Sequence, residues 1–476
     1  MRIISTFTFA AAMLFGATAV AQEQTVASFY TYNQPNVMYG VSPNGKYAVG
    51  CDEGVLTGVA VYWSHETGKF TDVFGVNADG VMTEGKGATL YGVANDGTAV
   101  GNFVNEAIQE EGKAAPVVPG MYKDGKWTAL ELLTDVLPGD ANGWARKISA
   151  DGRIIVGTVT SEIKTTEFQG SVLTAAGPKV PVMWIDGKIQ RIDEWEYQGQ
   201  GAYIRDMSDD GSVLVGWTEW YDGSRAPSVF KDGKVIRLCG TTPARDDVDK
   251  YDGWVYEGQL FTVSGDGTRC GGYFDMTGQG NSNIEGLVWD IPAEITDTLV
   301  EDTEVTSTGS YSPTAMDAEG RVYTVGAMGG GTNVWVEGES TPFVDYYNVV
   351  SNDDTYVSPA GIYDVDAEMK TFATTAIESA GGMGSYNAPL VIVFEDTKVG
   401  NGVTSVETDG LSLSYAGNRF TVTGEHRGIE VYTTNGTQVM QAGPATSDLD
   451  LSTLGGIYLV KVSVDGGFKV MKVLVD

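Results

Sequence analysis

The sequence is poor in the residues on which many catalytic and metal sites depend. Its 476 residues include two histidines and three cysteines, which disfavours Cys/His zinc sites and most catalysis by a histidine base. Positive charge is also scarce, because 30 Lys and Arg face 63 Asp and Glu, for a formal net charge of −33. A field of that sign repels phosphate backbones, so we expect no nucleic-acid partner.

Long apolar runs are missing after the N-terminus. The first 21 residues combine Arg2, an apolar stretch from Ile3 to Gly16, and Ala19-Val20-Ala21, which fits a small-x-small cleavage site. We therefore expect residues 1–21 to be a signal peptide. An uncleaved anchor would need about 20 continuous apolar residues. The sequence thus predicts a secreted or cell-surface protein with no transmembrane segment in the mature chain.

Glycine, by contrast, is abundant. The chain has 63 glycines, roughly twice the ~7% typical of proteins, without the G-X-Y period of collagen. Hydrophobic residues make up 42% of the sequence and aromatic residues 10%, enough for a sizeable core. This composition favours an all-β chain with many tight turns.

An internal repeat fills most of the chain. Each copy has an apolar stretch, then Ser-x-Asp/Asn-Gly or a variant, then an apolar run that often ends in glycine. The turn glycines are Gly45, Gly97, Gly152, Gly211, Gly267 and Gly320, with Met369 in the seventh place. Their spacing lies between 49 and 59 residues. Seven copies at such a period indicate a repeat architecture.

Each copy also contains a second hairpin, such as the one in PVMWIDGKIQRI ending at Ile192. Asp-Gly and Asn-Gly between apolar runs are hairpin signals, because a tight turn needs positive φ at its centre. One unit therefore has four antiparallel strands in about 50 residues, which predicts a propeller blade. The seventh copy ends after its third strand. We predict that Ala27–Tyr32 supplies the fourth strand beside Pro389–Phe394 and closes the ring.

These repeats resemble the secreted HAF-type repeats and, more loosely, the WD-repeat and TolB-like propellers. The resemblance covers roughly residues 25–396. It implies a seven-bladed β-propeller over residues 22–396 and leaves the function open, since propellers host many unrelated activities.

The C-terminal region follows a different pattern. Residues 397–410 are polar and contain glycine, as in a linker. Residues 411–476 hold about seven short alternating runs, with hairpin signals at Asn435-Gly436 and Asp465-Gly466. This pattern predicts a small Ig-like β-sandwich.

Three segments of this region, IEVYTTNGTQV, LDLSTLGGIYLVKVSVDGG and KVMKVLVD, resemble the C-terminal sorting domain of the Bacteroidetes type IX secretion pathway. The matching residues are Gly456, Ile457, Tyr458, Lys461, Lys469 and Lys472. The resemblance implies that this domain engages the secretion machinery and directs the chain across the outer membrane. An ordinary Ig-like accessory domain is the alternative.

Candidate binding residues lie at the starts of the innermost strands, six or eight positions before the turn residue. They are Tyr39, Tyr91, Trp144, Arg146, Tyr203, Arg205, Phe261 and Tyr363. A seven-fold ring would gather several of them at the mouth of the central channel. Aromatic walls with two arginines suit a sugar that bears a carboxylate or sulfate. The alternatives are packing between blades for the aromatics, and neutralisation of Asp206 or Asp209 for the arginines.

Further candidates lie on the long loops, which should emerge on one face, where propellers usually bind ligands. Among them are Trp220 and Trp254. The aspartates of PARDDVDKYDGW suggest a calcium loop with oxygen ligands, but their spacing departs from the EF-hand pattern. We therefore expect a solvated acidic loop and no metal or cofactor, with calcium binding as the alternative. A glycosidase needs two carboxylates about 5–10 Å apart, a distance that a sequence does not give.

The sequence therefore favours a non-catalytic binding module for a surface glycan or an extracellular protein. A carboxylate-dependent glycoside hydrolase or lyase in the same funnel, and a structural surface protein, are the alternatives.

Overall fold

The computed structural model describes residues 25–475 except 33–35, 53–57, 169–170, 193–200, 220–224, 239–257, 276–283, 296–298, 301–304, 310, 318, 327–330, 352–358, 380–384, 395–403, 409–410, 417, 434–436, 455 and 465–466. The expected signal peptide lies outside this part of the chain. The chain divides into two units between Glu395 and Asp396, and each is described by itself.

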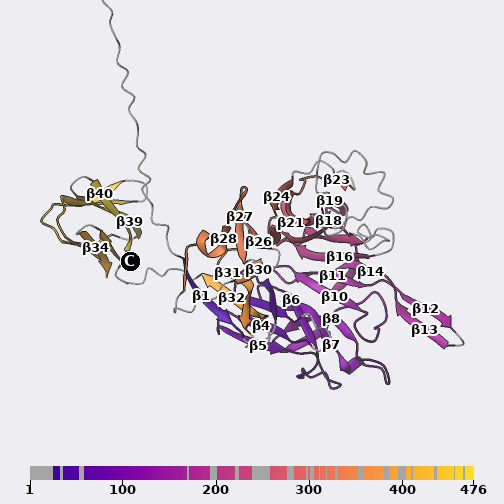
Figure 1. The fold of residues 1–476 in the computed structure, drawn as a ribbon. Helices are drawn as coiled ribbons and strands as arrows, with labels where there is room; N and C mark the ends of the chain where they lie inside the picture. The colour runs from indigo at the N-terminus through magenta and orange to yellow at the C-terminus, as the bar shows by residue number, and fades with distance from the viewer. Residues whose placement is uncertain are drawn as a thin grey trace, which may run out of the picture. The chain divides into compact units, whose positions relative to one another are not determined.

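The first unit contains seven sheets that form the blades of a β-propeller, each built around four antiparallel strands (Figure 1). In blades 4 and 7 a short fifth strand, β23 (Leu299–Val300) and β29 (Val349–Ser351), pairs parallel at the outer edge. Blade 1 consists of β2 (Val37–Val41), β3 (Tyr47–Cys51), β4 (Ala60–Ser64) and β5 (Lys69–Val73). Blade 2 consists of β6 (Ala88–Val93), β7 (Ala99–Val104), β8 (Val117–Lys123) and β9 (Lys126–Ala129). Blade 3 consists of β10 (Gly143–Ile148), β11 (Ile154–Thr160), β14 (Lys179–Ile185) and β15 (Lys188–Arg191).

Blade 4 consists of β16 (Gly201–Met207), β17 (Val213–Glu219), β18 (Arg225–Lys231) and β19 (Lys234–Leu238). Blade 5 consists of β20 (Gly258–Val263), β21 (Arg269–Asp275), β22 (Ile284–Asp290) and β24 (Val305–Gly309). Blade 6 consists of β25 (Tyr311–Met316), β26 (Val322–Gly326), β27 (Thr332–Val336) and β28 (Glu339–Pro342). Blade 7 consists of β30 (Pro359–Val365), β31 (Thr371–Ser379), β32 (Ser385–Phe394) and β1 (Thr25–Thr31). The seven-bladed prediction is confirmed.

The ring closes as predicted, through the N-terminal strand. Strand β1 pairs antiparallel with β32, with Ala27 opposite Phe394 and Thr31 opposite Leu390. Figure 1 shows the indigo β1 beside the orange β32. Ala27 is fully buried in one apolar cluster with Phe372 and Phe394. A strand from the start of the chain therefore completes a blade made from its end.

The repeat motif is explained by one set of turn contacts. The Ser208 hydroxyl donates to Asp210 (2.8 Å) and accepts the Val213 N–H (3.0 Å). The same Asp210 carboxylate accepts the Ser212 N–H (2.9 Å), and Gly211 takes φ +75°. Serine therefore ties the two strands together across the turn. The aspartate closes the turn, and glycine adopts the left-handed backbone that it tolerates best.

Every innermost strand carries a β-bulge at the same repeat position. The register shifts between Met38 and Gly40 in β2 and between Ala145 and Lys147 in β10, and each of the other five blades has an equivalent shift. The unpaired residues are Tyr39, Tyr91, Arg146, Arg205, Phe261, Thr314 and Tyr363. A bulge changes the direction of the side chain that it carries. Each of the seven blades therefore has one redirected side chain at the same position of its innermost strand.

Blade 3 contains two further strands in the long connection between β11 and β14. Within residues 157–180, β12 (Ile163–Phe168) pairs with β13 (Ser171–Ala176) as a separate two-stranded sheet. Figure 1 shows this hairpin extending away from its blade. The segment is rich in threonine and other residues that favour strands.

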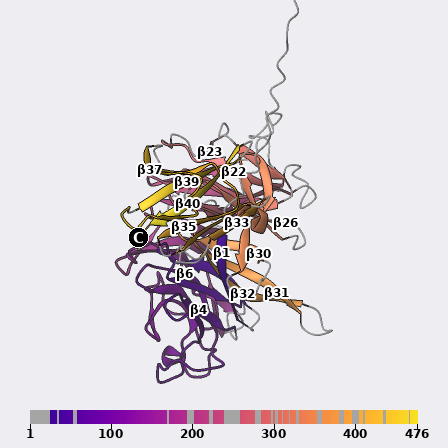
Figure 2. The same ribbon diagram turned by 90° about the vertical axis from the view of Figure 1, so that its left-hand side faces the viewer.

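The second unit contains two four-stranded sheets (Figures 1 and 2). One has the order β33 (Thr404–Thr408), β34 (Leu411–Ala416), β35 (Arg419–Thr423) and β38 (Asp448–Asp450). The other has the order β37 (Gln438–Ala442), β36 (Gly428–Thr433), β39 (Gly456–Val464) and β40 (Gly467–Val475).

The two sheets contribute to one buried core, which contains Leu413 and Phe420 from the first and Val431 and Val460 from the second. Strand β33 lies inside the segment expected to be a linker, where it pairs antiparallel with β34. The Ig-like topology stays a prediction. Among the described residues, no helix is long and apolar enough to cross a membrane.

We expect the closing strand to be sensitive to charge on its buried side. Ala27→Lys places an ammonium group in an apolar cluster, so it should lower the free energy of unfolding by about 3 kcal/mol or more. Thr31→Lys is the matched control, because Thr31 is exposed on the same strand, and it should change stability by less than about 0.5 kcal/mol. Urea unfolding followed by tryptophan fluorescence reports on the propeller, since all ten tryptophans precede residue 396. Equal losses in both variants would contradict this role of β1.

The seventh turn offers a test of the glycine requirement. Met369 occupies the glycine position with φ +60°, a conformation that costs an ordinary residue about 1–2 kcal/mol. Met369→Gly should therefore stabilise the propeller by about 1 kcal/mol. In the reverse control, Gly152→Met, a Cβ would meet nothing closer than the Ala94 methyl at 3.8 Å, so it should destabilise by a similar amount. A loss of stability in Met369→Gly would overturn this explanation.

Candidate functional site

The bulged residues enclose a hollow on the propeller axis. We call it the loop-side compartment, because it lies where the inner strands begin, at the end opposite their tight turns. It is lined by Tyr39, Tyr91, Arg146, Lys147, Arg205, Asp206, Phe261, Thr314 and Tyr363. Its volume is about 160 Å³. All seven bulged residues are in this set, one from each blade.

Three tyrosines from blades 7, 1 and 2 form one arc of the wall. The ring of Tyr39 lies 5.8 Å from that of Tyr363 and 5.5 Å from that of Tyr91, centroid to centroid. The Arg146 guanidinium follows in blade 3, with its central carbon 3.9 Å from the centre of the Tyr91 ring. In blade 4 the Arg205 guanidinium lies 5.8 Å from the centre of the Phe261 ring. The wall thus combines aromatic faces with two cations in neighbouring blades.

Neither arginine is paired with a carboxylate within the part of the chain that the structure describes. Asp206, one of the two carboxylates proposed to be neutralised by them, is engaged elsewhere: Lys147 lies 3.1 Å from it, and the Val263 N–H donates to it at 2.9 Å. Pairing with Asp206 is therefore not what fixes Arg146 and Arg205. Their contacts with the Tyr91 and Phe261 rings are cation–π interactions.

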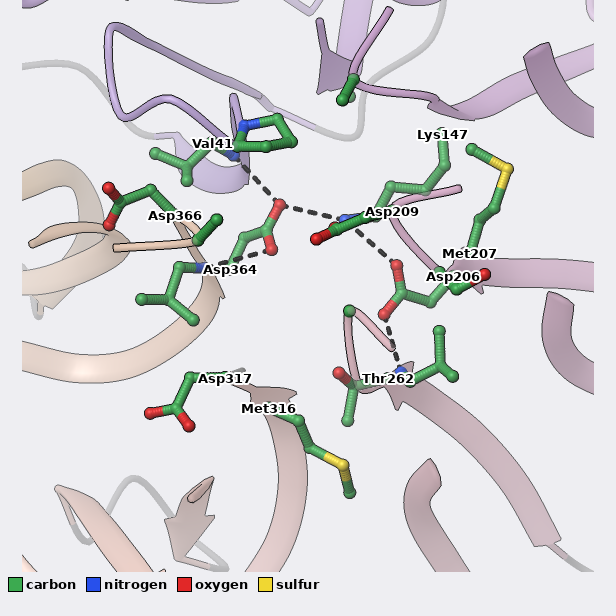
Figure 3. A pocket seen from close by; sticks show the side chains of 18 of the residues that line it. Val41, Lys147, Asp206, Met207, Asp209, Thr262, Met316, Asp317, Asp364 and Asp366 are labelled. Carbon is green, nitrogen blue, oxygen red and sulfur yellow. Dashed lines mark hydrogen bonds and ion pairs between the residues drawn. The ribbon is translucent and has the colours of Figure 1, made fainter. Parts of the chain in front are cut away.

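An ion triad separates this compartment from the space beyond it and forms its floor: Lys147 and Asp206 line the compartment, and Asp364 lies on the far side. The Lys147 ammonium lies 3.1 Å from Asp206 and 3.0 Å from Asp364 (Figure 3). The Lys147 side chain is 18% exposed, and Asp364 also accepts the Val41 N–H at 3.0 Å. Burial alone would lower the pKa of Lys147, but the two carboxylates outweigh it and raise that pKa above its usual value. Burial raises the pKa of Asp364, and Lys147 offsets only part of this effect.

A second hollow, the turn-side compartment, lies beyond the triad and shares Lys147 and Asp206 with the first (Figure 3). Its volume is about 70 Å³. Its acidic lining consists of Asp206, Asp209, Asp317, Asp364 and Asp366. The central channel is therefore divided into a cationic, aromatic half and an acidic half.

Two of these aspartates have structural roles. Asp317 bonds the Arg321 guanidinium (2.6 Å) and the Tyr323 hydroxyl (2.8 Å), and Asp366 accepts the Thr371 N–H (2.7 Å). Both occupy the position at which the other copies of the repeat have serine or alanine. There each aspartate accepts hydrogen bonds within its own turn, as the serine does in other copies. Burial raises the pKa of Asp366 and of Asp209.

The structure brings together six of the residues predicted for the channel mouth. They are Tyr39, Tyr91, Arg146, Arg205, Phe261 and Tyr363. Trp144 and Tyr203 are not among the lining residues, because they stack on each other between blades 3 and 4 with centroids 5.8 Å apart. The Tyr203 ring also stacks on Trp217 at 5.1 Å. The contacts of this pair are those of packing between blades. Trp220 and Trp254 lie outside the described residues.

Sequence reasoning missed Lys147, Asp206 and Thr314 as lining residues. Thr314 holds the same repeat position as the predicted ring residues, so the repeat register itself contained the signal. The next position along the repeat reads Gly40, Gly92, Lys147, Asp206, Thr262, Ala315 and Asp364. Charged residues occupy this position in three copies, and those three form the triad.

The residues of the predicted sorting motif lie on two neighbouring strands of the second unit. Gly456, Ile457, Tyr458 and Lys461 lie in β39, and Lys469 and Lys472 lie in β40. Lys461 bonds Glu430 at 2.8 Å, and Val462 stands opposite Lys469 in the sheet. Cys270 is a buried thiol in β21, while Cys239 and the acidic segment near residue 250 lie outside the described residues.

Comparison with known proteins finds similar solved structures. No family model matches the sequence, and no curated protein does. Similar solved structures include TolB from Acinetobacter baumannii, which is 12% identical, covers 57% of this chain and 54% of that one, and has a TM-score of 0.33. PorZ, a surface component of the type IX secretion system of Porphyromonas gingivalis, is 12% identical, covers 90% and 58%, and has a TM-score of 0.42. The Swd1 β-propeller domain from Myceliophteria thermophila is 10% identical, covers 78% and 100%, and has a TM-score of 0.39.

The chain thus spans little more than half the length of the first two of these proteins. Enzymes as well as secretion-related proteins are among the similar structures. Propeller proteins are among the similar structures, as the repeat predicted. They do not determine the function of this chain, so the function has to be inferred from the residues of the site.

We expect the floor to depend on Lys147. Lys147→Met leaves two carboxylates facing each other in a largely buried position, so it should lower the free energy of unfolding at pH 7 by about 3 kcal/mol. The folded pKa of Asp364 already lies above its ordinary value, so the folded protein gains stability as pH falls through that pKa. Loss of the cation raises this pKa further, and the deficit of the variant should shrink between pH 7 and pH 5.

Urea unfolding at both pH values measures this deficit. In the double variant Lys147→Met/Asp364→Asn, more than half of the loss at pH 7 should be recovered. Lys188→Met is the surface control, because Lys188 forms an ion pair with Glu131 but is 76% exposed. A deficit that is unchanged at pH 5 and is not relieved by Asp364→Asn would refute the triad.

Proposed function

We propose that this protein is an exported, non-catalytic binding module and that its loop-side compartment binds an anionic carbohydrate. The observation that carries the proposal is the pair of arginines in adjacent blades. Both line a partly exposed hollow, and neither has a carboxylate partner in the described part of a chain whose net charge is −33. In so acidic a protein, two cations in neighbouring blades that have no carboxylate partner among the described residues favour an anion from outside.

The electrostatics of the compartment support an anionic ligand. Three cationic side chains and one carboxylate line it. The field of the whole protein repels anions at long range, whereas at close range guanidinium groups bind carboxylates or sulfates through charge-assisted hydrogen bonds. The site therefore selects ligands that can reach the arginines directly.

The aromatic wall and the size of the compartment support a ring-shaped ligand. Tyr39, Tyr91, Phe261 and Tyr363 present apolar ring surface beside the cations, the combination of apolar lining and few polar groups found in small-molecule sites. A cavity of about 150 Å³ accommodates benzene, so 160 Å³ is enough for about one six-membered ring. A monosaccharide unit with an acidic substituent meets both conditions.

Binding without turnover is favoured over glycoside hydrolysis by the state of the lining carboxylate. A glycosidase uses two carboxyl groups on either side of the scissile bond. Asp206 is already bound by Lys147 and by the Val263 N–H, and Asp364 lines the other compartment. A lyase or hydrolase, a protein ligand and a purely structural role are the competing functions.

We also propose that the second unit delivers the propeller to the cell surface. This proposal rests on the resemblance of the segments around Gly456–Lys461 and Lys469–Asp476 to type IX sorting domains. The mature protein would then be secreted or attached to the outer membrane, where surface glycans are available as ligands.

An array of acidic and neutral glycans, probed with the full mature chain, tests the proposed function. We expect binding to glycans that bear carboxylates or sulfates, and weaker binding to their neutral analogues. Arg146→Gln and Arg205→Gln should each weaken binding about 10–100-fold, the loss expected for one hydrogen bond to a charged group. Arg153→Gln is the matched control, because it removes the same charge from an exposed ion pair with Asp186.

Unchanged affinity in both pocket variants would refute the proposed site. Release of a shortened or unsaturated product from a bound glycan would favour the enzyme instead. Binding to neither class of glycan would favour a protein ligand or a structural role.

A further inference from the structure

The loop-side compartment is closed at its inner end. Its floor is the triad of Lys147 from blade 3, Asp206 from blade 4 and Asp364 from blade 7. These charges are bonded to one another, and both carboxylates also accept backbone N–H groups, from Val263 and from Val41. A ligand that displaced the triad would leave buried charges unpaired, at a cost of several kcal/mol.

The space beyond the floor also excludes an anion. The turn-side compartment has five aspartates in its lining and about 70 Å³ of volume. An acidic chain that passed through the channel would have to place its negative groups among these carboxylates, against like-charge repulsion. The loop side is therefore the favourable side for an anion to enter and to leave.

The volume of the compartment sets a second limit on the ligand. With a volume of about 160 Å³, it has room for about one six-membered ring. An internal unit of a glycan has a glycosidic bond on each side, and both neighbours would have to leave through the same mouth. A terminal unit has one such bond, and its free end can point toward the floor.

We infer that the compartment receives the terminal unit of an acidic glycan, inserted end-on from the loop side, and that it does not bind internal units. This inference rests on the proposed function and narrows it. The two arginines hold the acidic group, the aromatic arc covers the ring, and the triad blocks further entry. Recognition then depends on chain ends and is independent of chain length.

The test uses the full mature chain with two ladders of probes. One ladder contains glucuronic acid oligomers of one, two, four and six units and a polymer of about forty units. The second contains galactose oligomers of the same lengths with sulfate on each unit, which separates a carboxylate from a sulfate as the recognised anion. Titration calorimetry gives the affinity for each probe, and light scattering gives the number of protein molecules on each polymer chain.

We expect the affinity for the preferred ladder to change by less than about tenfold between one unit and six. The polymer should bind no more than one protein molecule at each end. Arg146→Gln should weaken the binding of the single unit and of the hexamer by the same factor, since both make the same contacts.

Several protein molecules along one polymer, with affinity that rises steeply with length, would overturn end-on binding while leaving the proposed function intact. The absence of binding to both ladders, together with binding to neutral glycans or to none, would overturn the proposed function itself. The two failures are therefore distinguishable.

Discussion

The pairing of β1 with β32 is the interaction on which the rest of the molecule depends. Each blade has four strands and cannot bury both of its faces alone, so the sheets are stable only as neighbours in a ring. Without β1, the seventh blade would lose the strand that pairs with β32, and the edge of β32 would face solvent. The channel, and any site within it, exists only while all seven inner strands are held around one axis. The N-terminal strand is thus as much a part of the site as the residues that line it.

Within the closed ring, structural and functional residues occupy separate positions of the same repeat. In the turn after β16, the side chains of Ser208 and Asp210 bond to their own turn and to the strand that follows it, so the same motif can recur from blade to blade. The bulge lies six residues before the turn, and its side chain faces the axis. There the residue is free to differ, and the seven copies carry tyrosine three times, arginine twice, and one phenylalanine and one threonine. A symmetric scaffold thereby builds an asymmetric pocket, with its cations in two neighbouring blades.

The sequence was sufficient for those features that a period and an alternation specify. The spacing of the turn glycines predicted seven blades, and the missing strand after Phe394 predicted ring closure by residues 27–32. It was not sufficient where the outcome depends on the direction of a side chain. Trp144 and Arg146 are two residues apart on one strand, yet the first stacks on Tyr203 and the second lines the pocket. The bulge makes this difference, and no residue type marks it. The bond between Lys147 and Asp364 joins positions 217 residues apart, which no local pattern indicates.

The triad also explains how an acidic protein can hold a cationic pocket. Asp206 lines the same hollow as Arg146 and Arg205, and without another partner it would draw their guanidinium groups toward the floor and cancel their charge. Lys147 engages this carboxylate and Asp364 together, which leaves the arginines to rest on the Tyr91 and Phe261 rings. A cation held against an aromatic face keeps its N–H edge available for hydrogen bonds to another group. One buried lysine therefore does two things: it pairs with the carboxylates between the two compartments, and it leaves the two arginines available to the anion that we propose as the ligand.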